Sequence, residues 1–185
     1  MKTHRVITII GWLVSGILLF LWQEKYLPFH YEYIEQFRLF HYSADYFIEH
    51  CSYPSGIIEY LGSFLIQFFN QPHVGAGIVT ILLLSVGIGI QQIFKRIASH
   101  VDMPLAYLLP TLFLLFAGMD INYHLEGTLA FALSVWFLNI QVSFVRPVHR
   151  MISGVLLSWT LYYLAGPAFA LFALCSVIYE WHKRE

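Results

Sequence analysis

The chain has 185 residues, of which 58% are hydrophobic and only 11% are Asp, Glu, Lys or Arg. Soluble domains carry about 25% charged residues, so this composition excludes an ordinary water-soluble globule and indicates an integral membrane protein. The net charge of −1 argues against a nucleic-acid partner, which would need a basic patch or tail. The two cysteines, Cys51 and Cys175, are too few for a disulfide framework.

The first predicted helix is the apolar run 6–22, which follows the basic residues Lys2 and Arg5. A cleaved signal peptide begins in the same way. The residues after this run, 23–26, are Gln-Glu-Lys-Tyr, which are bulky or charged, whereas a cleavage site needs small residues. We therefore predict an uncleaved transmembrane helix.

The next region, residues 23–73, is predicted to be an outer loop that is rich in aromatic and acidic residues. Its aromatic residues predict short amphipathic helices lying on the membrane surface. Within it, the apolar residues of 55–70 recur at the 3.6-residue spacing of one helical face. This stretch is short for a span, so we predict an interfacial or re-entrant helix on the outer side. The alternative is a seventh span, which would invert the topology of everything downstream.

The remaining apolar blocks predict five further spans. The glycines of 74–93 allow neighbouring helices to approach closely, and Pro110 is expected to kink 104–118. The last block, 152–181, would be about 45 Å long as one helix, against a bilayer core of about 30 Å. Because Gly166-Pro167 interrupts this block, we predict a hairpin of two short helices. The six predicted spans are 6–22, 74–93, 104–118, 128–144, 152–165 and 168–181.

The distribution of basic residues sets the predicted topology. With six spans and both termini in the cytoplasm, eight of the ten Lys and Arg residues lie inside, and only Lys25 and Arg38 lie outside. Short loops that carry Lys and Arg stay preferentially in the cytoplasm, and a full span at 55–70 would destroy this bias. The predicted fold is therefore an all-α polytopic transmembrane bundle of about six spans, plus the outer interfacial or re-entrant helix. Residues 1–185 form a single transmembrane domain.

Acidic and histidine residues gather on the predicted outer side, in the first loop and in the turn 120–126. Carboxylate and imidazole groups can act as general bases or bind divalent cations, so one interpretation is an outward-facing site built from these two segments. The alternative is a solvated rim. No metal-ligand spacing such as His-Glu-x-x-His occurs, and the sequence assigns no metal or cofactor. Glu59 stands in an apolar stretch, where ionisable residues are often functional, unless it lies on the polar face of a surface helix.

Several segments resemble an uncharacterised family of bacterial multi-pass membrane proteins. They are Glu35-Gln36-Phe37-Arg38-Leu39-Phe40, Tyr46-Phe47, the stretch 54–69, Asn122-Tyr123 and the hairpin residues 162–166. The resemblance implies a domain of unknown function and carries no settled activity. We predict a component of the cell envelope in the bacterial inner (cytoplasmic) membrane that is either non-catalytic or a fragment of a larger protein. Because members of that family are longer, the resemblance also implies that this chain is the N-terminal membrane portion of a larger protein.

The layout is also loosely similar to that of GT-C-type glycosyltransferases, which depend on a lipid carrier. This similarity implies that Glu32, Glu35 or Asp45 is a catalytic base or a metal ligand, with a lipid-linked sugar as substrate at the outer face. Two functions therefore stay open. The first is a non-catalytic component that contacts the lipid bilayer and other membrane proteins, and the second is a membrane glycosyltransferase. The spans offer few polar residues that could line a path, which counts against a transporter.

Overall fold

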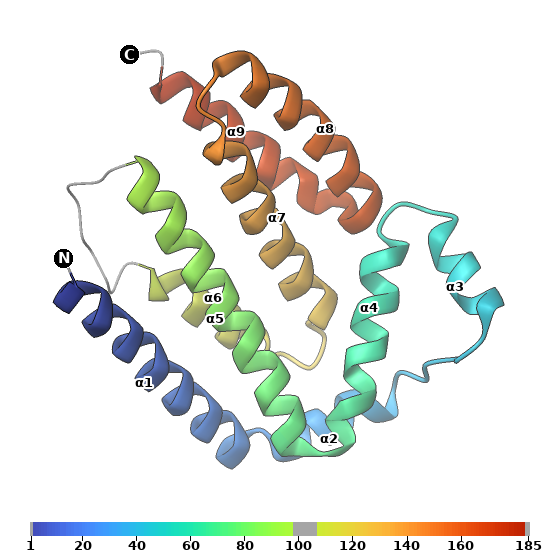
Figure 1. Cartoon of the computed structure of the whole chain (residues 1–185). Helices are drawn as coiled ribbons and strands as arrows, with labels where there is room; N and C mark the ends of the chain where they lie inside the picture. The colour runs from blue at the N-terminus through green and yellow to red at the C-terminus, as the bar shows by residue number, and fades with distance from the viewer. Residues whose placement is uncertain (1, 98–106, 184–185) are drawn as a thin grey trace.

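The computed structural model describes residues 2–97 and 107–183, and every regular element in this part of the chain is a helix (Figure 1). The predicted all-α fold is confirmed. In chain order the elements are α1 (Lys2–Tyr26), α2 (Pro28–Gln36), α3 (Ala44–Cys51), α4 (Gly56–Ile66), η1 (Gln67–Asn70), α5 (Pro72–Ile97), α6 (Leu108–Ala117), α7 (Leu125–Ser143), α8 (Pro147–Ala165), η2 (Gly166–Ala168) and α9 (Phe169–His182).

Helix α5 runs between α1 and α7 and packs closely against both (Figure 1). Its glycines make this approach possible, because a methyl group on Gly87 would lie 2.5 Å from the Trp12 ring and one on Gly89 would lie 2.6 Å from Val135. Side-chain hydrogen bonds link the same helices. The Trp12 indole N–H donates to Gln91 Oε1 at 3.0 Å, and Asn139 Nδ2 donates to the Gly89 carbonyl at 2.8 Å. The predicted glycine-mediated packing of this span is confirmed.

Four segments of the described chain are long and apolar enough to cross a membrane. Of the apolar window of the first segment, only 11% is buried inside the protein, so most of α1 presents its aliphatic side chains outward. Such a surface would be insoluble in water and suits a lipid environment. The segments are Val6–Tyr26, Pro72–Ile97, Leu125–Ser143 and Pro147–His182.

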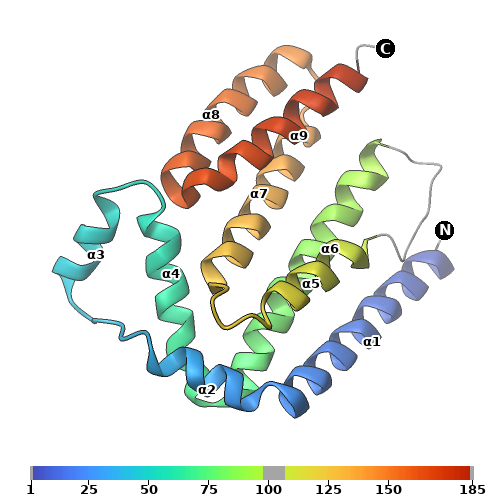
Figure 2. The same ribbon diagram turned by 180° about the vertical axis from the view of Figure 1, so that it is seen from behind.

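The last of these segments is not one helix but a hairpin, as the sequence predicts. Helices α8 and α9 lie side by side and antiparallel (Figures 1 and 2). Gly166 makes the turn with φ of +57°, a left-handed conformation that glycine adopts without a steric penalty. At the open end, Arg150 Nε lies 2.7 Å from Glu180 Oε1, and this ion pair joins the start of α8 to the end of α9.

Helix α6 differs from the prediction for 104–118. It begins at Leu108, and residues 104–106 lie outside the described part of the chain. Pro110 therefore occupies the first turn of α6, where the missing N–H costs no intrahelical hydrogen bond. A kink at Pro110 would involve residues 104–106, so this prediction falls outside the described residues. With 10 residues, α6 is about 15 Å long and reaches only part of the way across a bilayer core.

The stretch 55–70 forms α4 and η1, which confirms a helix in this region. Instead of lying over the bundle, α4 packs against α7 and α8 and buries Ile58, Gly62 and Ile66. Its start meets the tip of the α8–α9 hairpin, because the Ser55 N–H donates to the Tyr163 carbonyl at 3.1 Å. The helix is therefore an integral part of the bundle.

Candidate functional site at the acidic end

The described basic side chains from α5 onward gather at one end of the bundle, which we call the basic end. It contains the end of α5, the α7–α8 connection and the end of α9 (Figure 1). Arg96 Nη1 donates to the Asn139 carbonyl at 2.7 Å and joins α5 to α7 there. The start of α1 lies at the same end, because α1 is antiparallel to α5: Trp12 bonds to Gln91, and Gln23 bonds to Thr80 at 2.9 Å.

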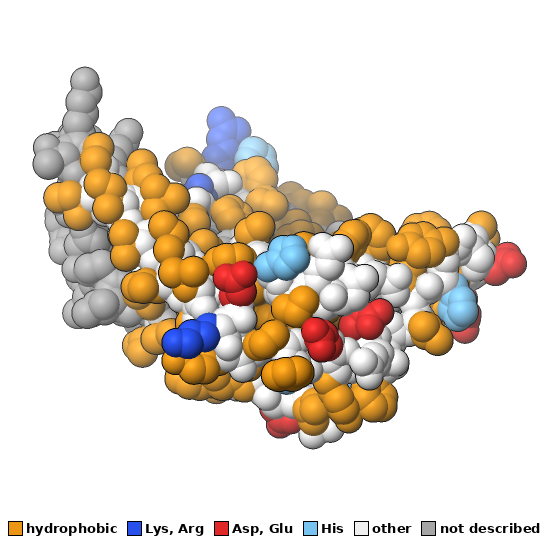
Figure 3. All heavy atoms as spheres, turned by 90° about the horizontal axis from the view of Figure 1, so that it is seen from below, with side chains coloured by type: hydrophobic (Ala, Val, Ile, Leu, Met, Phe, Trp, Pro, Cys, Tyr) orange, Lys and Arg blue, Asp and Glu red, His pale blue; other side chains and the backbone are white. Residues whose placement is uncertain are grey.

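The opposite end, which we call the acidic end, contains α2, η1, the start of α5 and the α6–α7 connection (Figure 1). The His30 ring nitrogen Nε2 lies 2.8 Å from the Gly118 carbonyl oxygen, which ties α2 to the end of α6. Figure 3 views the protein from this side and shows acidic side chains spread among hydrophobic ones.

An ion pair joins Arg38, two residues after α2, to Glu126 at the start of α7. Glu126 is in the first turn of α7, where the positive end of the helix dipole favours a carboxylate. Its side chain is only 10% exposed and that of Arg38 is 27% exposed. Both carboxylate oxygens of Glu126 are buried, and neither accepts a hydrogen bond from any described residue. The charge of Arg38 is thus the main compensation for a buried carboxylate.

Gly62 of α4 forms the wall against which Glu126 lies. A methyl group at Gly62 would be 2.6 Å from Glu126 Cγ, so only glycine leaves space for this side chain. The contact joins three segments that are distant in sequence, namely the first loop, α4 and α7. Arg38 of the first loop and Glu126 at the end of the turn 120–126 are therefore in contact, as the interpretation of a site built from these two segments requires.

Glu59 lies one turn before Gly62 and forms the second carboxylate of the site. It accepts hydrogen bonds from Ser55 Oγ at 2.6 Å and from the Tyr53 hydroxyl at 3.0 Å. Burial and the Glu59 carboxylate together raise the pKa of Tyr53 to about 12. Burial lowers the pKa of Arg38 and the nearby Glu59 charge opposes that shift, so Arg38 stays a cation at neutral pH.

Aromatic rings fill the space between α3 and α4. Phe40 is 8% exposed and its ring packs edge-on against Tyr42, Tyr46, Tyr60 and Phe64 at centroid distances of 4.9–5.5 Å. Such pairs add to the stabilisation that burial of apolar area gives. The aromatic residues that predict amphipathic surface helices therefore also build the small core that holds α3 in place.

The three candidate catalytic residues do not form one group. Glu32 and Asp45 are exposed on different helices, α2 and α3. Glu35 is half-buried at the end of α2, and its carbonyl accepts the N–H of Arg38 at 3.1 Å. Within the part of the chain that the structure describes, no group of three His, Cys, Asp or Glu side chains is arranged to hold a metal ion.

A buried hydrogen-bond chain lies between α1, α2 and α5, and the sequence analysis does not identify it. The Tyr31 hydroxyl donates to Gln23 Oε1 at 2.5 Å, and Gln23 Nε2 donates to Thr80 Oγ1 at 2.9 Å. Gln23 is fully buried and Tyr31 is 3% exposed, and burial raises the pKa of the Tyr31 phenol far above its ordinary value. The chain anchors α2 to the end of α1. In the sequence, the only sign of this hydrogen-bond chain is Gln23, a polar residue directly after the apolar run 6–22.

Both carboxylates of the site take part in contacts that join separate segments of the chain. Glu126 faces the Arg38 guanidinium, and Glu59 accepts hydrogen bonds from Ser55 and Tyr53. The arrangement holds these segments together.

A comparison with known protein families assigns this chain to one of them. A family model described as "Family of unknown function (DUF6057)" matches residues 3–185, and the chain belongs to this family. This confirms the resemblance to an uncharacterised family. Searches of curated proteins and of solved structures find no match.

Proposed function

We propose that this member of the DUF6057 family is a non-catalytic, multi-pass component of the bacterial cell envelope, set in the cytoplasmic membrane with both termini in the cytoplasm. The segregation of charge between the two ends of the bundle supports the membrane placement and orientation in this proposal. Lys95, Arg96, Arg146, Arg150 and Lys183 lie at the basic end, and Lys25 and Arg38 lie toward the other. Loops with excess Lys and Arg stay in the cytoplasm, so the basic end faces inward.

In this orientation α1, α5 and α7 cross the bilayer. The α8–α9 hairpin enters from the cytoplasmic side and ends within the bilayer core, and α6 covers only part of the core. Helix α4 begins at the hairpin tip and continues toward the outer end, which makes it the re-entrant helix of the sequence prediction. Its 11 residues cover about 16 Å, or about half of the bilayer core.

The outer layer, consisting of α2, α3 and the segment between them, suits a membrane surface or another membrane protein. Several of its large apolar side chains are exposed, including Phe29 at 83%, Leu39 at 80% and Tyr42 at 77%. The Arg38–Glu126 ion pair fixes this layer to α7. A rigid outer layer with exposed aromatic groups supports an assembly or scaffold role more than an enzymatic one.

The second candidate is a GT-C-like glycosyltransferase acting on a lipid-linked sugar at the outer face. The position of Glu35 favours it, because this carboxylate is half-buried beside the turn that carries Arg38 and no ion pair of Glu35 is found among the described residues. In this case Glu35→Gln should abolish a cell-envelope phenotype while the protein stays inserted, with Glu32→Gln and Asp45→Asn as parallel variants. If all three are silent, the enzyme hypothesis is rejected.

Labelling of single cysteines tests the proposed topology. In a background of Cys51→Ser and Cys175→Ser, a reporter at Asp45 should react with a membrane-impermeant thiol reagent in intact spheroplasts. A matched reporter at Val145, which is 89% exposed at the basic end, should react only after permeabilisation. The reverse pattern would overturn the orientation, and labelling of both in intact spheroplasts would overturn the placement of the two ends on opposite sides.

A further inference from the structure

The hairpin of α8 and α9 is shorter than the helices on the other side of the bundle. Helix α9 has 14 residues and is about 21 Å long, whereas the apolar segment Val6–Tyr26 of α1 has 21 residues and is about 31 Å long. Both have one end at the basic end of the bundle, so the hairpin tip stops short of the acidic end (Figures 1 and 2).

Helix α4 covers the distance that the hairpin leaves open. The Ser55 N–H, just before α4, donates to the Tyr163 carbonyl at the hairpin tip, and α4 then leads to η1 and the start of α5. With 11 residues, α4 is about 16 Å long, so the tip is up to about 16 Å away from the level at which α5 begins. The two sides of the bundle therefore differ in height.

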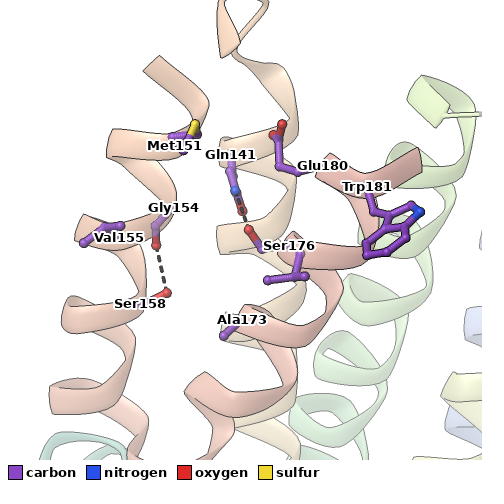
Figure 4. Close-up of a pocket in the computed structure, with 10 residues that line it drawn as sticks. Gln141, Met151, Gly154, Val155, Ser158, Ala173, Ser176, Glu180 and Trp181 are labelled. Atoms are coloured by element: carbon purple, nitrogen blue, oxygen red, sulfur yellow. Dashed lines mark hydrogen bonds between the residues drawn. The ribbon is translucent and has the colours of Figure 1, made fainter. Parts of the chain in front are cut away.

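On the basic side, the polar boundary of the hairpin lies in the last turn of α9. Glu180 is ion-paired with Arg150 there, and the neighbouring Trp181 is 71% exposed (Figure 4). An exposed Trp favours the headgroup level of a bilayer. Toward the tip, the groove between α8 and α9 has a mostly apolar lining, and Val155 and Trp159 are exposed on α8. The apolar belt of the hairpin therefore begins at Glu180 and extends to the tip.

Helix α3 lies beside the hairpin tip and forms the other polar boundary. The Tyr163 hydroxyl donates to the Cys51 carbonyl at the end of α3, and the Phe47 ring packs against Tyr60 of α4 at a centroid distance of 5.1 Å. Because Tyr60 is only about one turn into α4, α3 lies close to the level of the tip and not at the far end of α4.

The surface of α3 is not compatible with lipid hydrocarbon. Asp45 and Glu49 are both exposed on it, and so is Ser43 at its N-cap. In an undeformed bilayer, whose core is about 30 Å thick, a level about 21 Å from the basic boundary lies inside the hydrocarbon. Ionised side chains are costly there, whereas a bilayer adapts to a short hydrophobic span by thinning, at a modest cost per ångström.

We propose that the protein thins the bilayer along the face formed by the hairpin and α3, and that this face fits a thin bilayer. The hydrocarbon core would be about 21 Å thick beside the hairpin and about 31 Å thick beside α1. The inference rests on the proposed membrane placement, but not on which end faces the cytoplasm. Because mismatch in thickness sorts membrane proteins, this face would favour membrane regions that are already thin.

Depth measurements with spin labels test the proposal. A single cysteine in the background Cys51→Ser and Cys175→Ser carries a nitroxide, and the full chain is reconstituted in dioleoylphosphatidylcholine. Labels at the two boundaries of each side should collide with a water-soluble nickel complex, whereas a label inside α5 should collide with dissolved oxygen instead. The boundary variants are Ala44→Cys and Val145→Cys for the hairpin side and Val6→Cys and Tyr26→Cys for the α1 side, and the α5 variant is Ile81→Cys, at a side chain that is 68% exposed.

Removal of the α3 carboxylates gives an independent test. In the double variant Asp45→Leu and Glu49→Leu, the label at Ala44 should lose its collisions with the nickel complex, because α3 can then enter an undeformed core. The matched control is Glu24→Leu with Glu32→Leu, which removes the same charge from exposed positions at the acidic end and should leave the Ala44 label unchanged.

The label at Ile81 separates failure of this proposal from failure of the membrane placement. If the Ala44 and Ile81 labels both lie in hydrocarbon, the chain is in the membrane but does not thin it, and the proposal is wrong. If the Ile81 label lies in water, the membrane placement is wrong and the thinning with it. Nickel collisions of the Ala44 label that persist without the two carboxylates would also overturn the proposal, because α3 would then not draw the polar surface inward.

Discussion

Removal of the Arg38 charge is the most direct test of the site at the acidic end. Arg38→Met keeps much of the apolar stem but leaves the Glu126 carboxylate buried without a counter-charge. Two unit charges about 4 Å apart interact by about 4 kcal/mol at an effective dielectric constant near 20. Because the Arg38 side chain is 27% exposed, water screens part of this interaction. We therefore expect Arg38→Met to lower the free energy of unfolding by about 3 kcal/mol.

The measurement is unfolding of the purified protein in mixed micelles, followed by tryptophan fluorescence. Arg146→Met, an exposed arginine at the other end, is the matched control and should lose less than about 0.5 kcal/mol. Adding Glu126→Leu to Arg38→Met should recover most of the stability, because no buried charge remains. If Arg38→Met costs less than about 1 kcal/mol, or if the two substitutions are additive, the ion pair does not hold the outer layer.

Three further predictions follow from the same structure. A methyl group at Gly62 collides with Glu126, so Gly62→Ala should destabilise the protein by about 1–3 kcal/mol, whereas Gly11→Ala, which has nothing within 4 Å, should not. Gln23→Leu removes the centre of a buried hydrogen-bond chain and should cost about 1–3 kcal/mol in the same unfolding assay. The Tyr53 phenol should titrate near pH 12 in the absorbance difference between the unmodified chain and Tyr53→Phe. The contribution of Tyr53 to stability is complete below its unfolded pKa of about 10 and disappears as the pH rises through 12. A Tyr53 titration with its midpoint near pH 10 would contradict this prediction.

The helices of the bundle are largely predictable because their causes are local. Apolar runs bounded by charged residues fix each long helix to within a few residues, as the predicted 74–93 and the observed Pro72–Ile97 show. The hairpin is predictable for two reasons that agree. Gly166-Pro167 cannot continue a straight helix, and only a return of the chain brings Lys183 back to the side of Arg150.

The candidate site is less predictable because it depends on contacts between distant segments. Arg38 and Glu126 are 88 positions apart, and nothing in the residues around either one indicates that the two form a pair. The packing of α4 against α7 covers the Glu126 side chain, and Gly62 leaves the space for it. The composition of the first loop predicts an acidic outer side, but it contains no information about which carboxylate acquires a partner.

The start of α4 supplies hydrogen-bond partners to the tip of the α8–α9 hairpin, whose depth in the membrane follows from the position of the basic end. Helix α9 has 14 residues and is about 21 Å long, so the hairpin tip ends within a bilayer core of about 30 Å when its basic end is at the cytoplasmic surface. The polar groups at the tip then need partners, and the Ser55 N–H supplies one to the Tyr163 carbonyl, while the Tyr163 hydroxyl donates to the Cys51 carbonyl. Glu59 lies next to this junction and is satisfied by Ser55 and Tyr53. The ionisable residue of the apolar stretch 55–70 thus stabilises the strained turn before α4, where Ser55 has φ of +73°.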